Sequence, residues 1–237
     1  MVIDIVTNQI IDNSEHTYEK NNVTFIGVRI QDIESYANKM KFQILDTSWI
    51  AQMSPLNQQS YSARANETIK SLVNNVLNEV KNSVTAEFGE ILISMSAQDA
   101  LSITQDHHIL PLSELWKTRV RGNDSFDFHT ETKECYIVFG EAKYQTNKTS
   151  YNTALKQVVR FINLRKDDMD LADLMNLVTA KTKSTFETYG ALKSYAAAFS
   201  VKNLNNKKLI KQIKENKFFK QLMRQYKLYL IGIEICQ

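Results

Sequence analysis

Glycine and proline are scarce in this sequence of 237 residues, which contains 6 Gly and 2 Pro. Together they make up roughly 12% of an average protein. So low a content excludes a collagen-like chain, a linker-rich chain and an all-β chain punctuated by glycine and proline turns. It also makes the position of each glycine informative. The six are Gly27, Gly89, Gly122, Gly140, Gly190 and Gly232.

Cysteine and long apolar runs are lacking as well. Two cysteines, Cys135 and Cys236, are too few for a disulfide framework or a four-ligand zinc site. The N-terminal segment does not have the basic start, apolar stretch and small-residue cleavage site of a signal peptide. The longest apolar runs are far shorter than a membrane span. We therefore expect a cytoplasmic protein that does not contact a membrane.

Runs of β-branched and aromatic residues alternate with runs of helical spacing, which predicts an α/β protein. Strands are expected at residues 23–30, 42–50, 125–129, 135–144 and 228–235, the third and fourth forming a hairpin. Helices are expected at 64–83, 85–101, 151–164, 168–180 and 186–200. No linker or internal repeat interrupts the chain. We expect one domain over residues 1–237, with N-terminal strands in 1–63, a motif-bearing core in 64–165 and a helical, basic part in 166–237 that ends in a strand.

The basic residues gather near the C-terminus. Residues 181–237 contain 12 Lys or Arg and 3 Asp or Glu, although the formal net charge of the chain is only +3. Apolar residues recur at near-helical spacing within 202–227, which predicts an amphipathic helix with a basic outer face. Such a face can be simply solvated, can dock a partner protein or can contact DNA phosphates. The candidate phosphate contacts are Lys207, Lys208, Lys211 and Lys214.

The sequence contains no glycine-rich phosphate loop and no nucleophile elbow, since GxxxxGK[ST], GxGxxG and GxSxG are all absent. One constellation remains, RGNDSFDFHTETKECYIVFGEAKYQ at residues 121–145. Here an acidic residue opens one strand and Glu-x-Lys ends the next. Divalent-metal nucleases need carboxylates that hold Mg²⁺ beside the scissile phosphate, and a lysine that stabilises charge and orients the attacking water. The segment therefore indicates a metal-dependent nuclease site.

Glu-x-Lys alone is a weak signal, because it occurs four times in the chain. Two copies lie in helical patterns, where residues i and i+2 point in different directions, and one lies in the polar turn of the hairpin. Only Glu141 and Lys143 follow an apolar strand, on which residues i and i+2 share a face. Charges on that face cost desolvation free energy unless a metal or a substrate uses them. We therefore assign Glu141 and Lys143 to the site.

The second metal ligand is ambiguous between two aspartates. Asp124 lies at the entry of the first hairpin strand, and Asp127 lies between two phenylalanines. Periodicity does not choose between them. A third carboxylate is a candidate on the preceding helix, where Glu87 and Glu90 share a face at i, i+3.

The helix that follows the hairpin offers further candidates. Gln157 lies on an otherwise apolar stripe, and a buried glutamine needs hydrogen-bond partners, which favours a role in the active site. Lys156 and Arg160 are spaced i, i+4 on another face and can contact phosphates.

These motifs together resemble a known superfamily. GND-x-FDF followed by an apolar strand into GEAK and an aromatic residue, between a helix bearing GE and a helix bearing Gln, resembles the PD-(D/E)XK nucleases. Within them the segment 87–162 is similar to Hachiman A, the nuclease subunit of the Hachiman anti-phage defence systems.

The resemblance implies a restriction-endonuclease-like core, a mixed central β-sheet flanked by helices. It implies Mg²⁺-dependent DNA cleavage with little sequence preference, with Mn²⁺ as a possible substitute, and a superfamily 2 helicase that restrains the nuclease. Glu141 and Lys143 match the Glu-x-Lys, Asp124 or Asp127 matches the acidic strand residue, and Glu90 matches the helical glutamate. Two alternatives remain, a non-catalytic binding subunit of a defence complex and a standalone restriction or repair nuclease.

Glycine is concentrated near these candidates. Gly89, Gly122 and Gly140 each lie within two residues of an assigned carboxylate. Glycine permits close approach of another group to the backbone. The pattern predicts a bare backbone where metal and phosphate approach.

Overall fold

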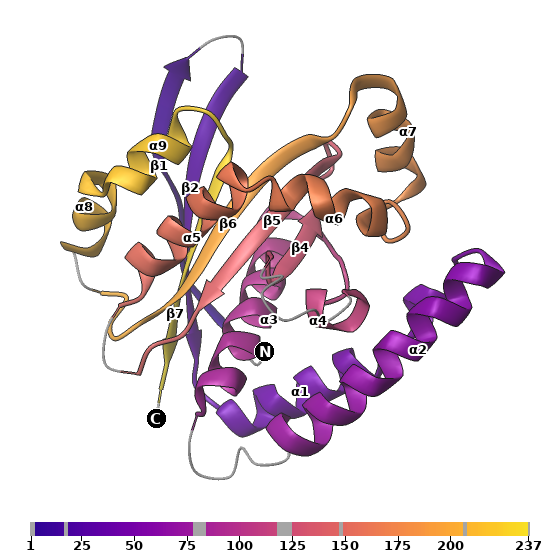
Figure 1. The fold of residues 1–237 in the computed structure, drawn as a ribbon. Helices are drawn as coiled ribbons and strands as arrows, with labels where there is room; N and C mark the ends of the chain where they lie inside the picture. Colours follow the sequence, from indigo (N-terminus) through magenta and orange to yellow (C-terminus); the bar gives the residue numbers. More distant parts are fainter. Residues whose placement is uncertain are drawn as a thin grey trace.

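A seven-stranded mixed sheet with helices on both sides forms the body of the protein (Figure 1). The computed structural model describes residues 3–16, 19–77, 84–117, 125–146, 149–205 and 208–236. The strand order is β1-β2-β7-β6-β5-β4-β3. The strands are β1 (Asp4–His16), β2 (Glu19–Ile30), β3 (His108–Ile109), β4 (Phe128–Glu131), β5 (Tyr136–Lys143), β6 (Leu192–Val201) and β7 (Leu228–Ile235).

The central strands of the sheet are parallel, so their carboxyl ends lie at the same border. Strands β2, β7, β6 and β5 run parallel to one another. At one edge β1 pairs antiparallel with β2, and at the other edge β4 pairs antiparallel with β5 and β3 antiparallel with β4. Parallel neighbours need crossover connections, which here are helical. As a result the carboxyl ends of β5, β6 and β7 meet at one border of the sheet.

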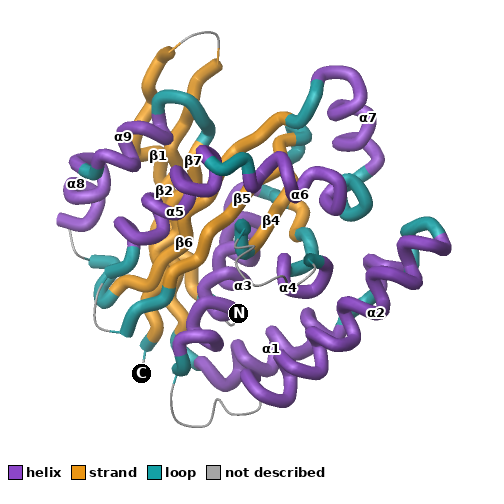
Figure 2. The backbone as a smooth tube through the Cα atoms, viewed as in Figure 1, coloured by secondary structure: helices purple, strands orange, loops and turns teal. Residues whose placement is uncertain are grey.

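The helices lie on both faces of the sheet (Figure 2). In that view α5 lies in front of the strands and α3 behind them, while α1 and α2 extend from the lower part of the molecule. The helices are α1 (Ile33–Leu45), α2 (Pro55–Ser71), α3 (Ala86–Gln105), α4 (Ser113–Trp116), α5 (Tyr151–Asn163), α6 (Lys166–Leu174), α7 (Ala180–Tyr189), α8 (Lys208–Glu215) and α9 (Lys217–Met223). A 3-10 turn, Ser48–Ile50, follows α1, and a π-helical turn, Leu72–Leu77, follows α2. None of the helices in the described residues has both the length and the apolar character needed to cross a membrane.

Helix α3 is buried along most of its length, because it lies between the sheet and the N-terminal helices. The Thr85 side chain caps it by accepting a hydrogen bond from Phe88 N at 3.2 Å. Its predicted extent, residues 85–101, is confirmed and continues to Gln105. The predicted hairpin is confirmed as β4 and β5, and the predicted strands at 23–30 and 228–235 are confirmed as parts of β2 and β7.

The predicted strand at residues 42–50 is wrong, since α1 continues to Leu45 and the 3-10 turn follows. Asp32 caps α1 by accepting from Ser35 N at 2.9 Å, and Tyr36, Met40 and Ile44 repeat at helical spacing toward the core. Burial of that apolar stripe in a helix outweighs the strand propensity of the β-branched and aromatic residues in this segment. Phe42 lies off the stripe and is 77% exposed. The N-terminal part of the chain therefore contains helices as well as strands.

The predicted helix at residues 186–200 is also wrong, because β6 occupies most of it. Helix α7 ends at Tyr189 and is followed by Gly190, whose φ of 79° lies in a region that glycine adopts more readily than other residues. Strand β6 is a central parallel strand, buried on both faces, so its apolar run shows no alternation. Its three alanines, Ala196–Ala198, account for the helical appearance of the segment in the sequence.

The predicted basic helix over 202–227 is divided into two. Helix α8 ends at Glu215, and the Asn216 side chain caps α9 by accepting from the backbone of Phe218 at 2.8 Å. Leu209, Ile213 and other apolar residues of both helices face the body of the protein, which confirms the amphipathic pattern.

A buried histidine, His107, makes stability depend on pH. Its Nδ1 lies 2.9 Å from the Thr130 hydroxyl, and its ring packs edge-on against Tyr229 with 5.0 Å between centroids. Burial lowers the pKa of His107 to about 4, and the nearby Lys227 ammonium contributes to the same shift. Between pH 6.5 and 4 the unfolded chain therefore binds a proton that the folded chain does not, so stability falls as the pH falls.

We expect His107 to contribute about 3 kcal/mol of this loss in the free energy of unfolding. Urea denaturation of the wild type and of His107→Gln from pH 7 to pH 4 measures it. The variant should show a shallower pH dependence, whereas His108→Gln, at the exposed neighbouring position, should keep the slope of the wild type. Equal slopes in His107→Gln and the wild type would contradict the assignment.

Candidate active site

The candidate site lies just before the start of β4, beside the carboxyl end of its antiparallel partner β5. The backbone N–H of Asp127 donates to Gly140 O at 2.9 Å, and the ladder between the two strands begins at Phe128. Beyond that point the N–H of Ala142 on β5 donates to the Asp127 carboxylate, Oδ2, at 2.7 Å. Asp127 is therefore held against the edge of β5, beside Glu141. The other candidate, Asp124, lies outside the described residues.

Glu141 is fully buried on β5, on the strand face it shares with Phe139. Its Oε1 lies 2.8 Å from Lys143 Nζ, with which it forms an ion pair. Apart from this ion pair, no group in the described part of the chain donates a hydrogen bond to either carboxylate oxygen of Glu141. Most buried polar groups in proteins do have such partners. An unsatisfied buried carboxylate indicates that another group completes it.

A second buried glutamate in the same sheet, Glu131 on β4, differs from Glu141 in that hydrogen bonds satisfy its carboxylate. It accepts hydrogen bonds from the backbone N–H of Thr179 at 2.9 Å, from the Thr179 hydroxyl and from the Thr182 hydroxyl. Glu131 thus joins the sheet to the start of α7. Its Glu-x-Lys sequence was predicted to lie in the polar turn of the hairpin, and this is wrong for Glu131, because β4 extends to that residue.

Lys143 connects the strand to α3. Its Nζ lies 3.2 Å from Glu90 Oε1, and its side chain is 16% exposed. Glu90 is more open to solvent, while Glu87, one turn earlier, is exposed. Two carboxylates, from Glu141 and Glu90, therefore pair with one ammonium group, and the Asp127 carboxylate lies near enough to act on it electrostatically. The cluster carries excess negative charge at its buried end.

The pKa values of the cluster are shifted by burial and by the closeness of its carboxylates. Burial raises the pKa of Glu141 well above its ordinary value, and the neighbouring Asp127 carboxylate raises it further. Burial also raises the pKa of Asp127. Burial by itself lowers the pKa of Lys143, but the Glu141 and Asp127 carboxylates outweigh it and hold that pKa above its ordinary value. Added positive charge would stabilise the ionised carboxylates.

The donor set suits a hard divalent cation. Across the described ranges, no group of three or more His, Cys, Asp and Glu side chains is placed to hold a metal ion. Mg²⁺ does not require one, since it commonly binds through one or two carboxylates and completes its shell with water and substrate phosphates. Asp127 and the unsatisfied Glu141 meet that smaller requirement.

The expectation that glycines leave space for metal and phosphate is wrong at the two positions that can be checked. A Cβ added at Gly89 would lie 2.2 Å from a ring carbon of Tyr144, and one added at Gly140 would lie 2.3 Å from the ring of Phe128. Both glycines accommodate aromatic rings that pack on the backbone. Gly122 lies outside the described residues.

A lysine that sequence reasoning missed holds the segment that carries Asp127. Lys117 Nζ donates to Phe126 O at 2.7 Å and lies 2.9 Å from the Asp170 carboxylate on α6. The Ser125 hydroxyl donates to the same carboxylate at 2.6 Å. These contacts fix residues 125–126 immediately before Asp127. No local pattern in the sequence indicates them, because Lys117 and Asp170 meet only through the tertiary fold.

Helix α5 covers the side of the sheet on which Phe139 lies, through the contact of Phe161 with Phe126. Gln157 is half-buried on this helix. No hydrogen bond or ion pair among the described residues joins it to Glu141, so its role stays a prediction. Lys156 and Arg160 are exposed on the outer side of α5.

Helices α8 and α9 continue this outer surface. Asn216, between them, donates from Nδ2 to the Asn152 side chain at the start of α5 at 2.7 Å. Lys208, Lys211 and Lys214 are exposed on α8, and Lys207 lies outside the described residues. Figure 1 shows α5, α8 and α9 side by side on the same side of the sheet.

Comparison with other proteins adds no further assignment: no protein-family model and no curated protein matches this chain.

Proposed function

We propose that this chain is a divalent-metal-dependent DNA endonuclease with a PD-(D/E)XK core. The observation that carries the proposal is the buried Glu141 carboxylate, which lies beside Asp127 and has no partner within the described residues other than the Lys143 ammonium. A carboxylate kept in this state costs folding free energy. Costs of this kind are concentrated at functional sites.

The residues divide the work of phosphodiester hydrolysis between them. Asp127 and Glu141 would hold Mg²⁺, and Glu90 lies close enough to Lys143 to fix that side chain between two carboxylates. A bound Mg²⁺ supplies positive charge next to the scissile phosphate. The Lys143 ammonium donates to the attacking water and stabilises negative charge that develops on the phosphate.

One surface, formed by helices α5 and α8, supplies the contacts to DNA in this proposal. The exposed lysines of α8 and the exposed Lys156 and Arg160 of α5 form an outer basic surface, here called the α5–α8 surface. Contacts between basic side chains and phosphates position a protein on DNA without reading its sequence. Little sequence preference follows from such a surface.

The biological setting rests on the resemblance of residues 87–162 to Hachiman A. We propose that the chain is the effector of a bacterial anti-phage defence system and that a superfamily 2 helicase restrains it until infection. The unsatisfied carboxylate favours catalysis over a role in binding alone, because a binding subunit has no use for it.

Incubation of the purified chain with supercoiled plasmid tests the activity, with Mg²⁺ or with a chelator and with or without the proposed helicase partner. We expect nicked and linear products only with the metal. Absence of cleavage under every condition, with intact binding of DNA, would favour the non-catalytic binding subunit instead.

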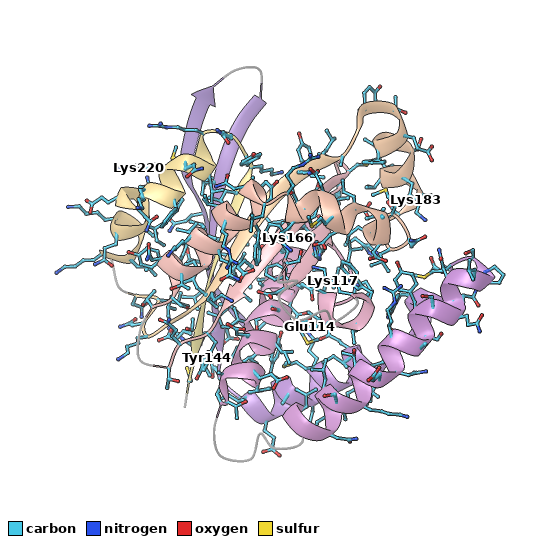
Figure 3. The ribbon with its side chains drawn as sticks, in the orientation of Figure 1. Glu114, Lys117, Tyr144, Lys166, Lys183 and Lys220 are labelled. Atoms are coloured by element: carbon cyan, nitrogen blue, oxygen red, sulfur yellow. The ribbon has the colours of Figure 1, made fainter. Side chains whose placement is uncertain are left out.

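Charge reversal on α8 tests the DNA surface. The double variant Lys211→Glu and Lys214→Glu should weaken binding to all DNA sequences alike and reduce the salt dependence of binding by about one unit of slope for each phosphate that is no longer neutralised. Lys70→Glu, at an exposed position on α2, is the matched control. Figure 3 labels Lys220 on α9 and Lys183 on α7, on opposite sides of the view, and Lys183→Glu is a second control. Equally weakened binding in the α8 variant and the controls would contradict the assigned surface.

A further inference from the structure

A pocket of about 170 Å³ lies at the carboxyl ends of β5, β6 and β7. Ligands of open α/β sheets bind outside this border. The pocket is lined by Tyr144 and Thr146 after β5, by Ser200 and Lys202 at the end of β6, and by Ile235 at the end of β7. Its volume equals that of roughly five water molecules, which is room for one planar heterocycle and not for a folded peptide.

Tyr144 joins this pocket to the carboxylate cluster. It follows Lys143 directly, and its ring packs on the bare backbone of Gly89, the residue before Glu90. Lys143 and Tyr144 at the end of β5 thus meet Glu90 and Gly89 of α3, and of these four residues Tyr144 also lines the pocket. Figure 3 shows Tyr144 at the lower end of the sheet.

Hydrogen bonds hold the wall in place. The Ser200 hydroxyl accepts from Gln145 N at 2.9 Å and donates to Gln145 O at 3.1 Å, which fastens the segment after β5 to β6. The Ser150 hydroxyl donates to Lys143 O at 2.7 Å. A preformed wall lowers the entropic cost of binding a ligand.

The chemistry of the lining indicates a base together with a phosphate. Lys202 is exposed, no described carboxylate pairs with it, and no acidic residue among those described lines the pocket. Tyr144 supplies an aromatic ring, and the Thr146 hydroxyl supplies a polar contact. Aromatic stacking with a nearby cation is the usual combination for single-stranded nucleic acid.

We propose that this pocket binds one unpaired base of the DNA strand next to the scissile phosphate, with the base against Tyr144 and a phosphate of the same strand on Lys202. The inference rests on the proposed nuclease function and extends it to the substrate: DNA with an unpaired nucleotide beside the cut. A base in a duplex stack cannot enter a pocket without being extruded. Gaps, frayed ends and single strands are therefore the preferred substrates.

Binding and cleavage are measured separately to test this. In the presence of a chelator, the wild type should bind an oligothymidine of about 12 nucleotides roughly tenfold more tightly than an abasic chain of equal length. Tyr144→Leu should lose that difference and Tyr144→Phe should keep it. Lys202→Gln should weaken the binding of both chains by the same factor, because its contact is to phosphate.

In the cleavage assay, the wild type should cut a duplex with a short gap faster than the intact duplex. If the wild type cleaves DNA but neither its binding nor its cleavage rate depends on an unpaired base, the subsite is overturned and the nuclease proposal stands. Base-dependent binding that Tyr144→Leu abolishes, in a chain that never cleaves, would support the subsite and refute the nuclease. The comparison of the two oligomers with the wild type needs no variant, so a misfolded Tyr144→Leu does not decide the result.

Discussion

Glu141→Gln should abolish Mg²⁺-dependent DNA cleavage and at the same time stabilise the protein. Loss of a metal-binding carboxylate removes several kcal/mol of transition-state stabilisation, so we expect a rate at least about 1000-fold lower. Glutamine has nearly the same shape but no charge to desolvate. The Glu141 carboxylate has only the Lys143 ammonium as a partner in the described structure, and that ammonium keeps Glu90 as a partner in the variant. The replacement should therefore raise the free energy of unfolding by about 1–2 kcal/mol.

Glu131→Gln is the matched control for this prediction. Glu131 is also a buried glutamate of the central sheet, but Thr179 and Thr182 satisfy it. Its replacement should lower the free energy of unfolding by about 2 kcal/mol and leave the rate of cleavage by the folded protein unchanged. Chemical denaturation and plasmid cleavage measure both quantities. A Glu141→Gln variant that is less stable than the wild type, and still active, would show that Glu141 is a structural residue.

Lys143→Met is expected to have the second largest effect. The ammonium lies between Glu141 and Glu90, at 2.8 Å and 3.2 Å. Without it, buried carboxylates remain unpaired, which should lower the free energy of unfolding by about 3 kcal/mol. Cleavage should be lost as well, since no other described ammonium group forms an ion pair with Glu141 or Glu90.

The metal distinguishes this loss from simple misfolding. Because Mg²⁺ binds only the folded protein, it should restore part of the stability of Lys143→Met without restoring cleavage. Lys133→Met removes the lysine of another Glu-x-Lys, an exposed residue paired with Asp106. That variant should match the wild type in both stability and cleavage. Thermal unfolding with and without Mg²⁺ provides the comparison, and a Lys143→Met protein that cleaves normally would contradict the role of Lys143.

Strand periodicity correctly placed Glu141 and Lys143 on one face of β5, where their side chains form an ion pair, because alternate residues of a strand share a face whatever the surrounding fold. It also predicted the hairpin that carries them. The same local logic failed for α1, where the apolar stripe of Tyr36, Met40 and Ile44 outweighs the β-branched and aromatic residues near its end. Local propensity is a weak guide when burial favours the other structure.

Other parts of the site depend on contacts between distant segments and could not be read from the sequence. The anchoring of Asp127 through Lys117 and Asp170 joins residues far apart in the chain. The packing of Tyr144 on Gly89 similarly joins β5 to α3. The sequence indicated that Gly89 was unusual, but the reason is an aromatic ring and not a metal or a phosphate.

Calorimetric titration of the purified chain with Mn²⁺, which can replace Mg²⁺ at sites of this type, tests the central claim most directly, because it does not depend on the activation state of the nuclease. The wild type and Glu131→Gln should bind the ion with equal affinity, and Glu141→Gln should bind it at least about tenfold more weakly. Equal binding by all three proteins, or none by the wild type even with a DNA oligomer present, would contradict a metal centre at Glu141.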